Sequence, residues 1–457
     1  MSTSGSVAGP ENPCDGHHFF PRNPSGNYIS LVRGEGVYVF DERGKAILDG
    51  ASGAAVACLG HGNARIANRL ASQARMLAFA HGSQFVSPQV IELADRLAAL
   101  APCRESRVYF ASGGSEATET ALKIALAYQS ASGASSRRLI GSRSISYHGA
   151  TLGALAMTGH LQRRRLYEPL LPSFPKTSTC FCYRCPHDLV AASCSVECAD
   201  DVERTISATG ASHLAAFILE PVIGASAPGV SAPVEYMDRV ATTCRAHDIL
   251  LIADEVMSGV GRTGRFCAME HYGVNADITV LSKALSAGYS PLAAVIVSGR
   301  VYERIRQGGA QHLVHGFTYS GNPLSAAVGL EVLDILEEDR LIERVDRLGR
   351  LLLDRLTSLY SFPMVGEVRG KGLLLGIEFV ADQKARSPFK PELGIAWRVQ
   401  RAALDEGLWI YGGTGSQNGT AGDHVLIAPP YIISEEQIDE LVHKLSNAIR
   451  AVQAACA

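Results

Sequence analysis

A single lysine, Lys283, directly follows the apolar run ITVLS. Lysine is costly to bury and its pKa shifts readily, so a lysine at such a point is either a surface residue whose stem covers apolar groups or an amine that forms a Schiff base with a carbonyl compound. Asp254 and Glu255 follow a second apolar run, ILLIA. A carboxylate there can pair with a protonated ring nitrogen, and such a charge-assisted hydrogen bond contributes roughly 1.5–3 kcal/mol. A metal site is the alternative, although no histidine or further acid stands nearby at ligand spacing.

Two more apolar runs end in groups that suit a planar ligand with a phosphate. RVYF leads into a Gly-Gly-Ser turn that ends at Ser115 and opens a helix, where free backbone N–H groups, the helix dipole and the hydroxyl suit a phosphate. The alternative there is a plain helix cap. RLIGSRSIS leads to Tyr147 and His148, whose rings either stack on a flat ligand or pack in the core. Together the four features indicate a phosphate, a flat ring, a ring nitrogen that needs an anion and an aldehyde that needs an amine, which pyridoxal phosphate (PLP) combines.

These residues need a scaffold that brings strand ends together. From residue 108 onward, short apolar runs alternate with helical patterns. The alternation predicts an α/β domain with a mainly parallel sheet covered by helices on both faces. Ligands of such sheets bind beyond the carboxyl ends of the strands, so the four features should meet at one edge.

The rest of the chain predicts a smaller α+β domain. An amphipathic pattern over 323–359 precedes the strand-like runs VRGKGLLLGIEFV and HVLIAPP, and Ser434 forms a capping box with Gln437 at the start of a last helix. The opening strands between residues 28 and 50 form a meander that is too short to fold alone, so we expect it to pack on the C-terminal part. We predict a disordered tail (1–15), a small domain made from both chain ends (16–60 and 331–457) and a large PLP-binding domain (61–330).

The composition excludes several classes of partner. The 457 residues include 42 Lys and Arg against 45 Asp and Glu, a formal net charge of −3, so no basic excess is available for a nucleic acid. No apolar stretch approaches the roughly 20 residues that cross a bilayer, and the first dozen residues lack the pattern of a signal peptide. We therefore expect a cytoplasmic protein, with no membrane contact, whose cysteines are reduced.

Five cysteines crowd into one segment: Cys180, Cys182, Cys185, Cys194 and Cys198. Cys182 and Cys185 are spaced like zinc ligands, and Cys194 and Cys198 could complete a set of four. The other interpretation is a surface insertion with reduced thiols. We expect no metal here and keep the zinc loop as the alternative.

The chain resembles the class III, or ω-, aminotransferases of PLP fold type I, from about residue 27 to residue 442. Eight stretches carry the resemblance in the family's order: LDGASGAAVACLGHG, SGGSEATETALK, SYHGAT, EPVIGA, ADEVMSGVGRTG, SKALSAGYSPLAAV, TYSGNPLSAA and VRGKGLLLGIEF. The resemblance implies a mainly parallel sheet of the seven-stranded type in the large domain. It also implies ping-pong transfer of an amino group from an amine or an ω-amino acid to a keto acid such as pyruvate or 2-oxoglutarate. The expected assembly is a homodimer, or a tetramer built from it, with a shared active site.

The resemblance assigns roles around the cofactor ring. Lys283 would form the internal aldimine and, once released by the substrate amine, carry a proton between the substrate and the cofactor. Asp254 would keep the pyridine nitrogen protonated. Val256 would pack beneath the ring and Tyr147 above it, with His148 beside Tyr147.

The resemblance also assigns the ends of the site. Gly114 and Ser115 would bind the phosphate, helped by Thr318 from the second subunit. Glu220 would lie near the cofactor and the substrate. Arg369 matches the arginine that grips a substrate carboxylate in relatives that act on amino acids. Apolar pocket walls are expected from residues 56–59, from Phe85 and Val86, and from the partner subunit.

The sequence departs from the family pattern at three positions. Gly113 stands where a serine is common, which removes one hydroxyl from the phosphate turn. Ala284 follows the lysine in place of the usual glycine, and Asn322 stands where histidine is frequent. These differences leave the chemistry possible but make the choice of substrate hard to transfer from a relative.

Other activities have to be weighed. GVGRTG over residues 259–264 fits a dinucleotide fingerprint and would suit an NAD-dependent dehydrogenase, but a Rossmann loop opens an apolar helix directly, whereas arginines stand at 262 and 265. A PLP-dependent racemase, decarboxylase or aminomutase of the same fold is the closer alternative. A binding protein without catalysis has no need of the amine of Lys283.

Overall fold

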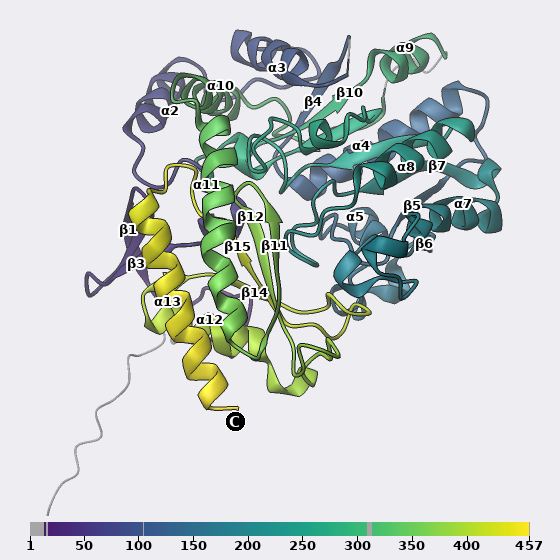
Figure 1. Ribbon diagram of the computed structural model, residues 1–457. Helices are drawn as coiled ribbons and strands as arrows, with labels where there is room; N and C mark the ends of the chain where they lie inside the picture. The colour runs from purple at the N-terminus through teal and green to yellow at the C-terminus, as the bar shows by residue number, and fades with distance from the viewer. Residues whose placement is uncertain (1–12, 15–16, 104, 309–312, 457) are drawn as a thin grey trace, which may run out of the picture.

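The computed structural model describes residues 13–14, 17–103, 105–308 and 313–456. Nearly all of the predicted tail, residues 1–15, lies outside the described residues. A seven-stranded sheet with the order β4-β10-β9-β8-β7-β5-β6 forms the centre of the molecule (Figure 1). Its strands are β4 (Arg107–Ala111), β5 (Leu139–Arg143), β6 (Lys176–Thr177), β7 (Leu214–Leu219), β8 (Leu250–Asp254), β9 (Ile278–Leu281) and β10 (Ala293–Val297). β10 runs antiparallel to both of its neighbours and the other pairs are parallel, which confirms the predicted mainly parallel sheet.

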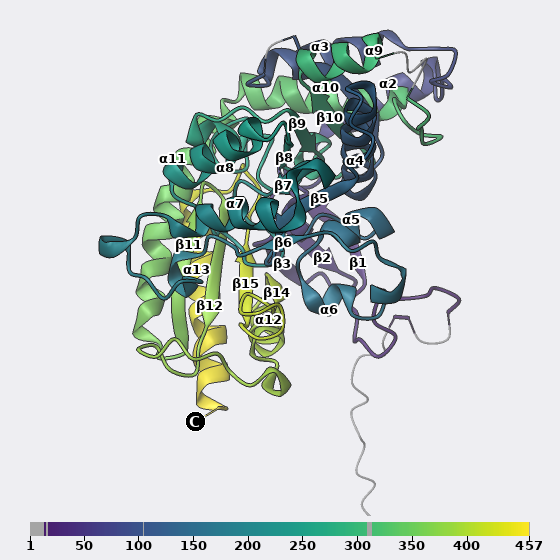
Figure 2. The same cartoon turned by 90° about the vertical axis from the view of Figure 1, so that its right-hand side faces the viewer.

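Helices cover both faces of this sheet. On β7, Ile218 packs in one cluster with residues of α4 (Gly114–Ala131), whereas its neighbour Phe217 packs in another with residues of α7 (Glu197–Thr209) and α8 (Val234–Ala246). Figure 2 shows α4 on one side of the sheet and α7 and α8 on the other. Because successive side chains enter opposite apolar layers, the central strands are apolar throughout rather than alternating.

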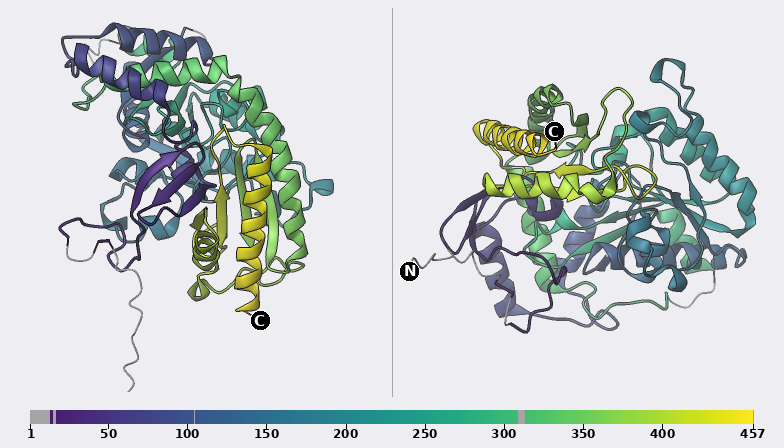
Figure 3. Two further views of the ribbon diagram at one scale, coloured as in Figure 1. Left: turned by 90° about the vertical axis from the view of Figure 1, so that its left-hand side faces the viewer. Right: turned by 90° about the horizontal axis from the view of Figure 1, so that it is seen from below.

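Two four-stranded sheets, β1-β2-β3-β13 and β11-β12-β15-β14, complete the α/β fold. Their strands are β1 (Leu31–Glu35), β2 (Tyr38–Asp41), β3 (Ala46–Asp49), β11 (Val365–Lys371), β12 (Leu374–Phe379), β13 (Leu408–Trp409), β14 (Tyr411–Gly413) and β15 (His424–Ile427). Leu408 of β13 pairs in parallel with Leu48 of β3, so the N-terminal meander joins a C-terminal strand (Figure 3). The exact domain boundaries stay a prediction.

The other helices are α1 (Ser52–Ala55), α2 (Ala64–Met76), α3 (Pro88–Leu100), α5 (Leu152–Met157), α6 (Leu161–Arg164), α9 (Gly299–Gln307), α10 (Pro323–Glu338), α11 (Leu341–Leu356), α12 (Ile395–Asp405) and α13 (Glu435–Ala454). The capping box predicted at Ser434 is confirmed, because its hydroxyl accepts from Gln437 N while the Gln437 side chain accepts from Ser434 N. No helix in the described part of the chain is both long enough and apolar enough for a membrane crossing.

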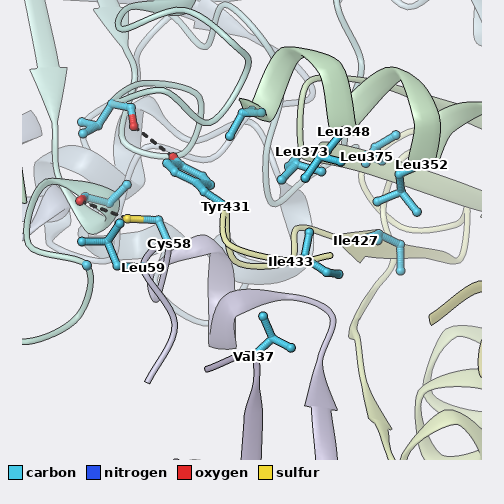
Figure 4. Packing of buried hydrophobic residues seen from close by; sticks show 14 of the residues in the cluster. Val37, Cys58, Leu59, Leu348, Leu352, Leu373, Leu375, Ile427, Tyr431 and Ile433 are labelled. Carbon is cyan, nitrogen blue, oxygen red and sulfur yellow. Dashed lines mark hydrogen bonds between the residues drawn. The ribbon is translucent and has the colours of Figure 1, made fainter. Parts of the chain in front are cut away.

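A continuous apolar core lies between the large sheet and the C-terminal elements (Figure 4). Leu348 and Leu352 of α11 belong to it together with Ile427 of β15. Two hydrogen bonds tie this core to the loops at the edge of the central sheet: Cys58 Sγ donates to Ala284 O (3.5 Å), and the Tyr431 hydroxyl donates to Val260 O (3.0 Å). The first bond holds the segment that carries Lys283 from the N-terminal part of the chain, and the second holds the loop after β8 from the C-terminal part.

Candidate active site

The carboxyl ends of the parallel strands open onto a cavity of about 230 Å³. The sequence-predicted residues that line it are Gly114, Ser115, Tyr147, His148, Glu220, Asp254, Val256 and Lys283. They follow strands β4, β5, β7, β8 and β9, as expected for an α/β sheet whose ligand binds at the strand ends. A larger cavity of about 1050 Å³ lies elsewhere and contains none of these residues, so volume alone does not mark the site.

Lys283 starts a short 3₁₀ turn directly after β9 and Ser282. Its backbone is in the left-handed region (φ 49°), a conformation that costs a non-glycine residue roughly 1–2 kcal/mol. Nζ donates a hydrogen bond to Ala54 O (3.0 Å). Burial lowers the pKa of the Lys283 ammonium to about 8, although the Asp254 and Glu220 carboxylates act in the opposite direction. A substantial fraction of the amine is therefore neutral, and so nucleophilic, near neutral pH.

Asp254 and His148 form a buried pair beside Lys283. His148 Nδ1 lies 2.7 Å from Asp254 Oδ2, and Oδ1 of the same carboxylate accepts from Val256 N (3.1 Å). On the far side of the imidazole, His148 Nε2 is buried and has no partner among the described groups. The carboxylate is thus oriented from two sides and keeps acceptor capacity for a further cation.

Glu255, the second acid of the motif, has a different environment. Its carboxylate accepts from Ala268 N and Met269 N and does not line the cavity. Burial raises the pKa of Glu255 to about 7 despite these two hydrogen bonds. Only Asp254 of the two acids is available to a ligand, which removes the pair as a metal site.

Glu220 holds the backbone of the loop that carries Tyr147. It accepts from Tyr147 N (3.0 Å) and from Gly224 N (2.8 Å), and burial raises its pKa. The Tyr147 backbone is therefore fixed relative to β7. The Tyr147 ring lines the cavity next to the Asp254–His148 pair.

The N-terminus of α4 lines the cavity with groups that suit an anion. Gly113, the N-cap of α4, offers no side-chain hydrogen bond to the first backbone N–H groups of this 18-residue helix. A Cβ on Gly114 would lie 2.9 Å from Val256 Cγ1, and a Cβ on Gly149 would lie 2.7 Å from Ser115 Oγ. Both glycines keep the helix terminus open, so a phosphate fits there.

The structure does not bring Thr318 or Arg369 to this cavity. Thr318 lies exposed on the loop between α9 and α10. The Arg369 guanidinium is buried, and its Nη1 contacts Glu367 (2.6 Å) and Glu378 (3.0 Å). Its charge is already matched by two protein carboxylates, which argues against the predicted role of Arg369 in gripping a substrate carboxylate.

None of the predicted wall residues 56–59, Phe85 and Val86 lines the cavity of the single chain. Cys58 and Leu59 are buried in the core, and Ala54 faces the cavity instead. Phe85 and Val86 are exposed, at 68% and 61%, and do not line the cavity.

Two arginines at the cavity were missed from the sequence. Arg163 of α6 and Arg22 of the N-terminal segment both line it. The Arg163 guanidinium lies over the Tyr147 ring, 4.5 Å from its centroid. Arg163 begins a run of three arginines that resembles an ordinary solvated surface, so no local signal singles it out.

The structure gives no support to the dinucleotide and zinc interpretations. After β8 the chain forms turns rather than a helix, and Arg262 of GVGRTG is buried and donates to Pro429 O (2.6 Å). Within the described residues, no group of three or more His, Cys, Asp or Glu side chains could hold a metal ion. In the cysteine segment, Cys194 contacts Glu197 instead (3.4 Å).

Comparison with known proteins gives one consistent result. Residues 20–449 match the family model described as aminotransferase class-III. An uncharacterised aminotransferase of Bacillus subtilis, YodT, is 40% identical over 430 residues, which cover 94% of this chain and 96% of YodT.

Solved structures of transaminases resemble this chain over almost its whole length. An (S)-enantioselective ω-transaminase from Thermomicrobium roseum superposes with a TM-score of 0.90 at 37% identity, covering 95% of this chain and 96% of that one. A pyridoxamine-phosphate (PMP)-bound aminotransferase from Vibrio fluvialis has a TM-score of 0.87 at 30% identity and covers 94% of both chains. Class III aminotransferases use PLP as their cofactor. The chain belongs to the class III aminotransferase family.

Proposed function

We propose that this aminotransferase moves an amino group from an amine or an ω-amino acid to a keto acid such as pyruvate or 2-oxoglutarate, with the two substrates binding in turn. The observation that carries the proposal is the buried amine of Lys283, whose pKa is lowered to about 8, beside the oriented carboxylate of Asp254. The likeness to an ω-transaminase of Thermomicrobium roseum favours amine donors.

The residues present fit PLP. The glycine-lined terminus of α4 suits its phosphate, and the Asp254 carboxylate, oriented by His148 and by Val256 N, suits a protonated ring nitrogen. When bound, the cofactor supplies an aldehyde that captures the substrate amine and a ring that withdraws electrons from the substrate carbon.

The chain's own residues would hold the cofactor from several sides. Ser115 and the first N–H groups of α4 would bind the phosphate, and Tyr147 and Val256 would flank the ring. Asp254 would bind the ring nitrogen, with His148 fixing the carboxylate. Lys283 Nζ would hold the aldehyde carbon, and Glu220 would keep Tyr147 in position through the backbone.

Lys283 also has to move a proton. Once its Nζ is free, the neutral amine can take the proton from the substrate carbon and return it on the other side of the reaction. A pKa of about 8 suits this task, because both protonation states are populated near the working pH.

We infer that the active unit is a homodimer with a shared site. Thr318 and Tyr319 lie exposed on the loop between α9 and α10, and the Tyr319 ring contacts Phe79 (centroids 6.1 Å apart). Phe85 and Val314 are also exposed, Val314 at 85%. A second copy would cover these apolar side chains and bring its Thr318 to the phosphate end. The cytoplasmic location stays a prediction.

A donor and acceptor panel tests the proposal. Purified holoenzyme is mixed with simple alkyl and aryl amines, ω-amino acids and α-amino acids, and the absorbance of the lysine-bound cofactor is followed. We expect that at least one donor removes this absorbance and that pyruvate or 2-oxoglutarate restores it. If no donor changes the absorbance of an enzyme that has bound the cofactor, the proposal is wrong.

A further inference from the structure

We propose that Arg163 binds the carboxylate of the keto acid acceptor, and of any amino acid donor, in the cavity of Lys283. This inference rests on the proposed function and names the substrates of the site as carboxylic acids held by α6. It replaces Arg369, which lies outside the cavity.

The backbone around Arg163 is fixed by its neighbours. On one side, His160 is buried and its Nε2 contacts Thr414 O (2.8 Å). On the other side, Arg164 donates to Thr158 O (2.8 Å) and pairs with Glu168 (2.8 Å). Arg163, which lies between these two anchored residues, therefore projects its side chain from a fixed turn.

The guanidinium of Arg163 has an aromatic partner but no anionic one. It lies 4.5 Å from the centroid of the Tyr147 ring, within the range of about 6 Å for a cation–π contact. In the described part of the chain, its guanidinium makes no hydrogen bond or ion pair. By contrast, the adjacent Arg164 uses its guanidinium for a carboxylate and two carbonyls.

The other charges of the cavity are already engaged. The Glu220 carboxylate accepts hydrogen bonds from two backbone N–H groups. The Asp254 carboxylate contacts the His148 ring and accepts from one backbone N–H. A half-buried guanidinium without an anion pays a desolvation cost that a ligand can remove. Its planar fork matches the two oxygens of a carboxylate, and Tyr147 fixes the plane of approach.

Arg22 is the competing cation. It also lines the cavity, but its residue is exposed and belongs to the segment before β1, and no described aromatic ring lies in cation–π contact with it. An exposed and unanchored arginine gives weaker and less oriented binding than an anchored one. The geometry therefore assigns the carboxylate to Arg163.

The test compares Arg163→Gln and Arg163→Lys with Arg165→Gln and Arg22→Gln. Arg165 is the matched control, because it belongs to the same run of three arginines and is exposed. Calorimetric titration of each holoenzyme with butyrate, a carboxylate that cannot react, measures binding. Half-reaction rates with an arylalkyl amine and the KM for pyruvate and for 2-oxoglutarate measure function.

We expect Arg163→Gln to weaken butyrate binding and to raise the KM of the keto acid by about 10- to 100-fold, as for a charge-assisted bidentate contact. Arg163→Lys should recover only part of this loss, because it keeps the charge and lacks the fork. The half-reaction with the arylalkyl amine should change less than threefold, and Arg165→Gln should match the wild type.

Three results would overturn the inference: equal losses for the amine and the keto acid, a loss in Arg22→Gln but not in Arg163→Gln, or release of cofactor from Arg163→Gln, which would place the guanidinium on the phosphate. If the wild type converts no amine at all, the proposed function fails instead. The butyrate titration still reports on Arg163 in that case.

Discussion

The cavity around Lys283 and the cluster around Arg369 both bury charged side chains. The cluster pairs its arginines with carboxylates, whereas the cavity holds Lys283 by a hydrogen bond to a backbone carbonyl. In the cluster, Glu378 is fully buried and contacts both Arg369 and Arg184, and Arg369 also contacts Glu367. In the cavity, Lys283 Nζ donates to the backbone carbonyl of Ala54 and, among the described residues, forms no ion pair within 4 Å.

The difference separates structural charge from functional charge. Arg184 belongs to the cysteine-rich segment and Glu378 to β12, so their ion pair joins segments 194 residues apart in the chain. The cavity instead leaves charge unmatched at a place where a ligand can reach it, and unmatched buried charge is unfavourable until the ligand binds. Mutations should therefore reduce activity in one region and stability in the other.

The largest effect is expected for Lys283→Ala. Loss of the amine removes both the anchor for the aldehyde and the proton carrier, so kcat should fall by at least about 10⁴-fold. Thermal stability should be unchanged or higher, because the variant no longer buries an ammonium. Steady-state rates and a melting curve check both parts, and turnover near the wild-type rate would contradict the assignment.

The second-largest loss of kcat is expected for Asp254→Asn. A neutral amide keeps the shape of the site but cannot balance a protonated ring nitrogen, so we expect a loss of about 10²- to 10³-fold in kcat. His148 should still contact the amide oxygen, which keeps the fold. Kinetics combined with circular dichroism tests this, and unchanged kinetics would remove Asp254 from the site.

Glu378→Gln should act on stability alone. Removal of one charge leaves Arg369 and Arg184 with less anionic compensation in a buried place, and breaking such a pair costs about 3–5 kcal/mol. Glu367→Gln is the matched control, since Glu367 is 23% exposed and should cost less. Denaturant unfolding measures the free energy, and kcat of the folded protein should stay at the wild-type value. A fall in kcat without a loss of stability would place this cluster in the active site.

The pH dependence of cofactor capture should show the smallest effect. The pKa of Lys283 is lowered to about 8, so the neutral amine increases as the pH rises through 8 and reaches a plateau above it. At pH 7 about a tenth of the amine is neutral, so the rate at which the apoprotein binds PLP should be about tenfold below the plateau. The rise of cofactor absorbance after mixing, from pH 6 to 10, measures this. A midpoint near 10.5, the ordinary value for lysine, would contradict it.

Sequence patterns predicted part of the cavity because the predicted residues that line it stand at or shortly after the ends of apolar strands. Lys283, Asp254 and Glu220 are each marked by such a local signal, and a parallel sheet brings its strand ends together whatever the details of packing. The family resemblance implied a sheet of the seven-stranded type, whereas the order of its strands comes from the structure.

Arg369 and Arg163 were harder to interpret, because strand pairing and tertiary contacts decide what surrounds their side chains. Glu367 and Glu378 lie opposite each other on β11 and β12, and Arg369 relieves the repulsion between these like charges. Only the strand register reveals this use. Arg163, Arg164 and Arg165 look alike in sequence, yet Arg163 lies over the Tyr147 ring, Arg164 is buried against Thr158 O and Glu168, and Arg165 is exposed.

We propose that the residues of the Lys283 cavity carry out transamination in two half-reactions. The most direct test of this proposal is to add an amine donor alone to the holoenzyme and to count the carbonyl product. We predict one equivalent of product per active site, then a stop, then recovery when pyruvate or 2-oxoglutarate is added. Continued conversion of a single amino acid without any acceptor would contradict the account and would indicate a racemase, decarboxylase or aminomutase.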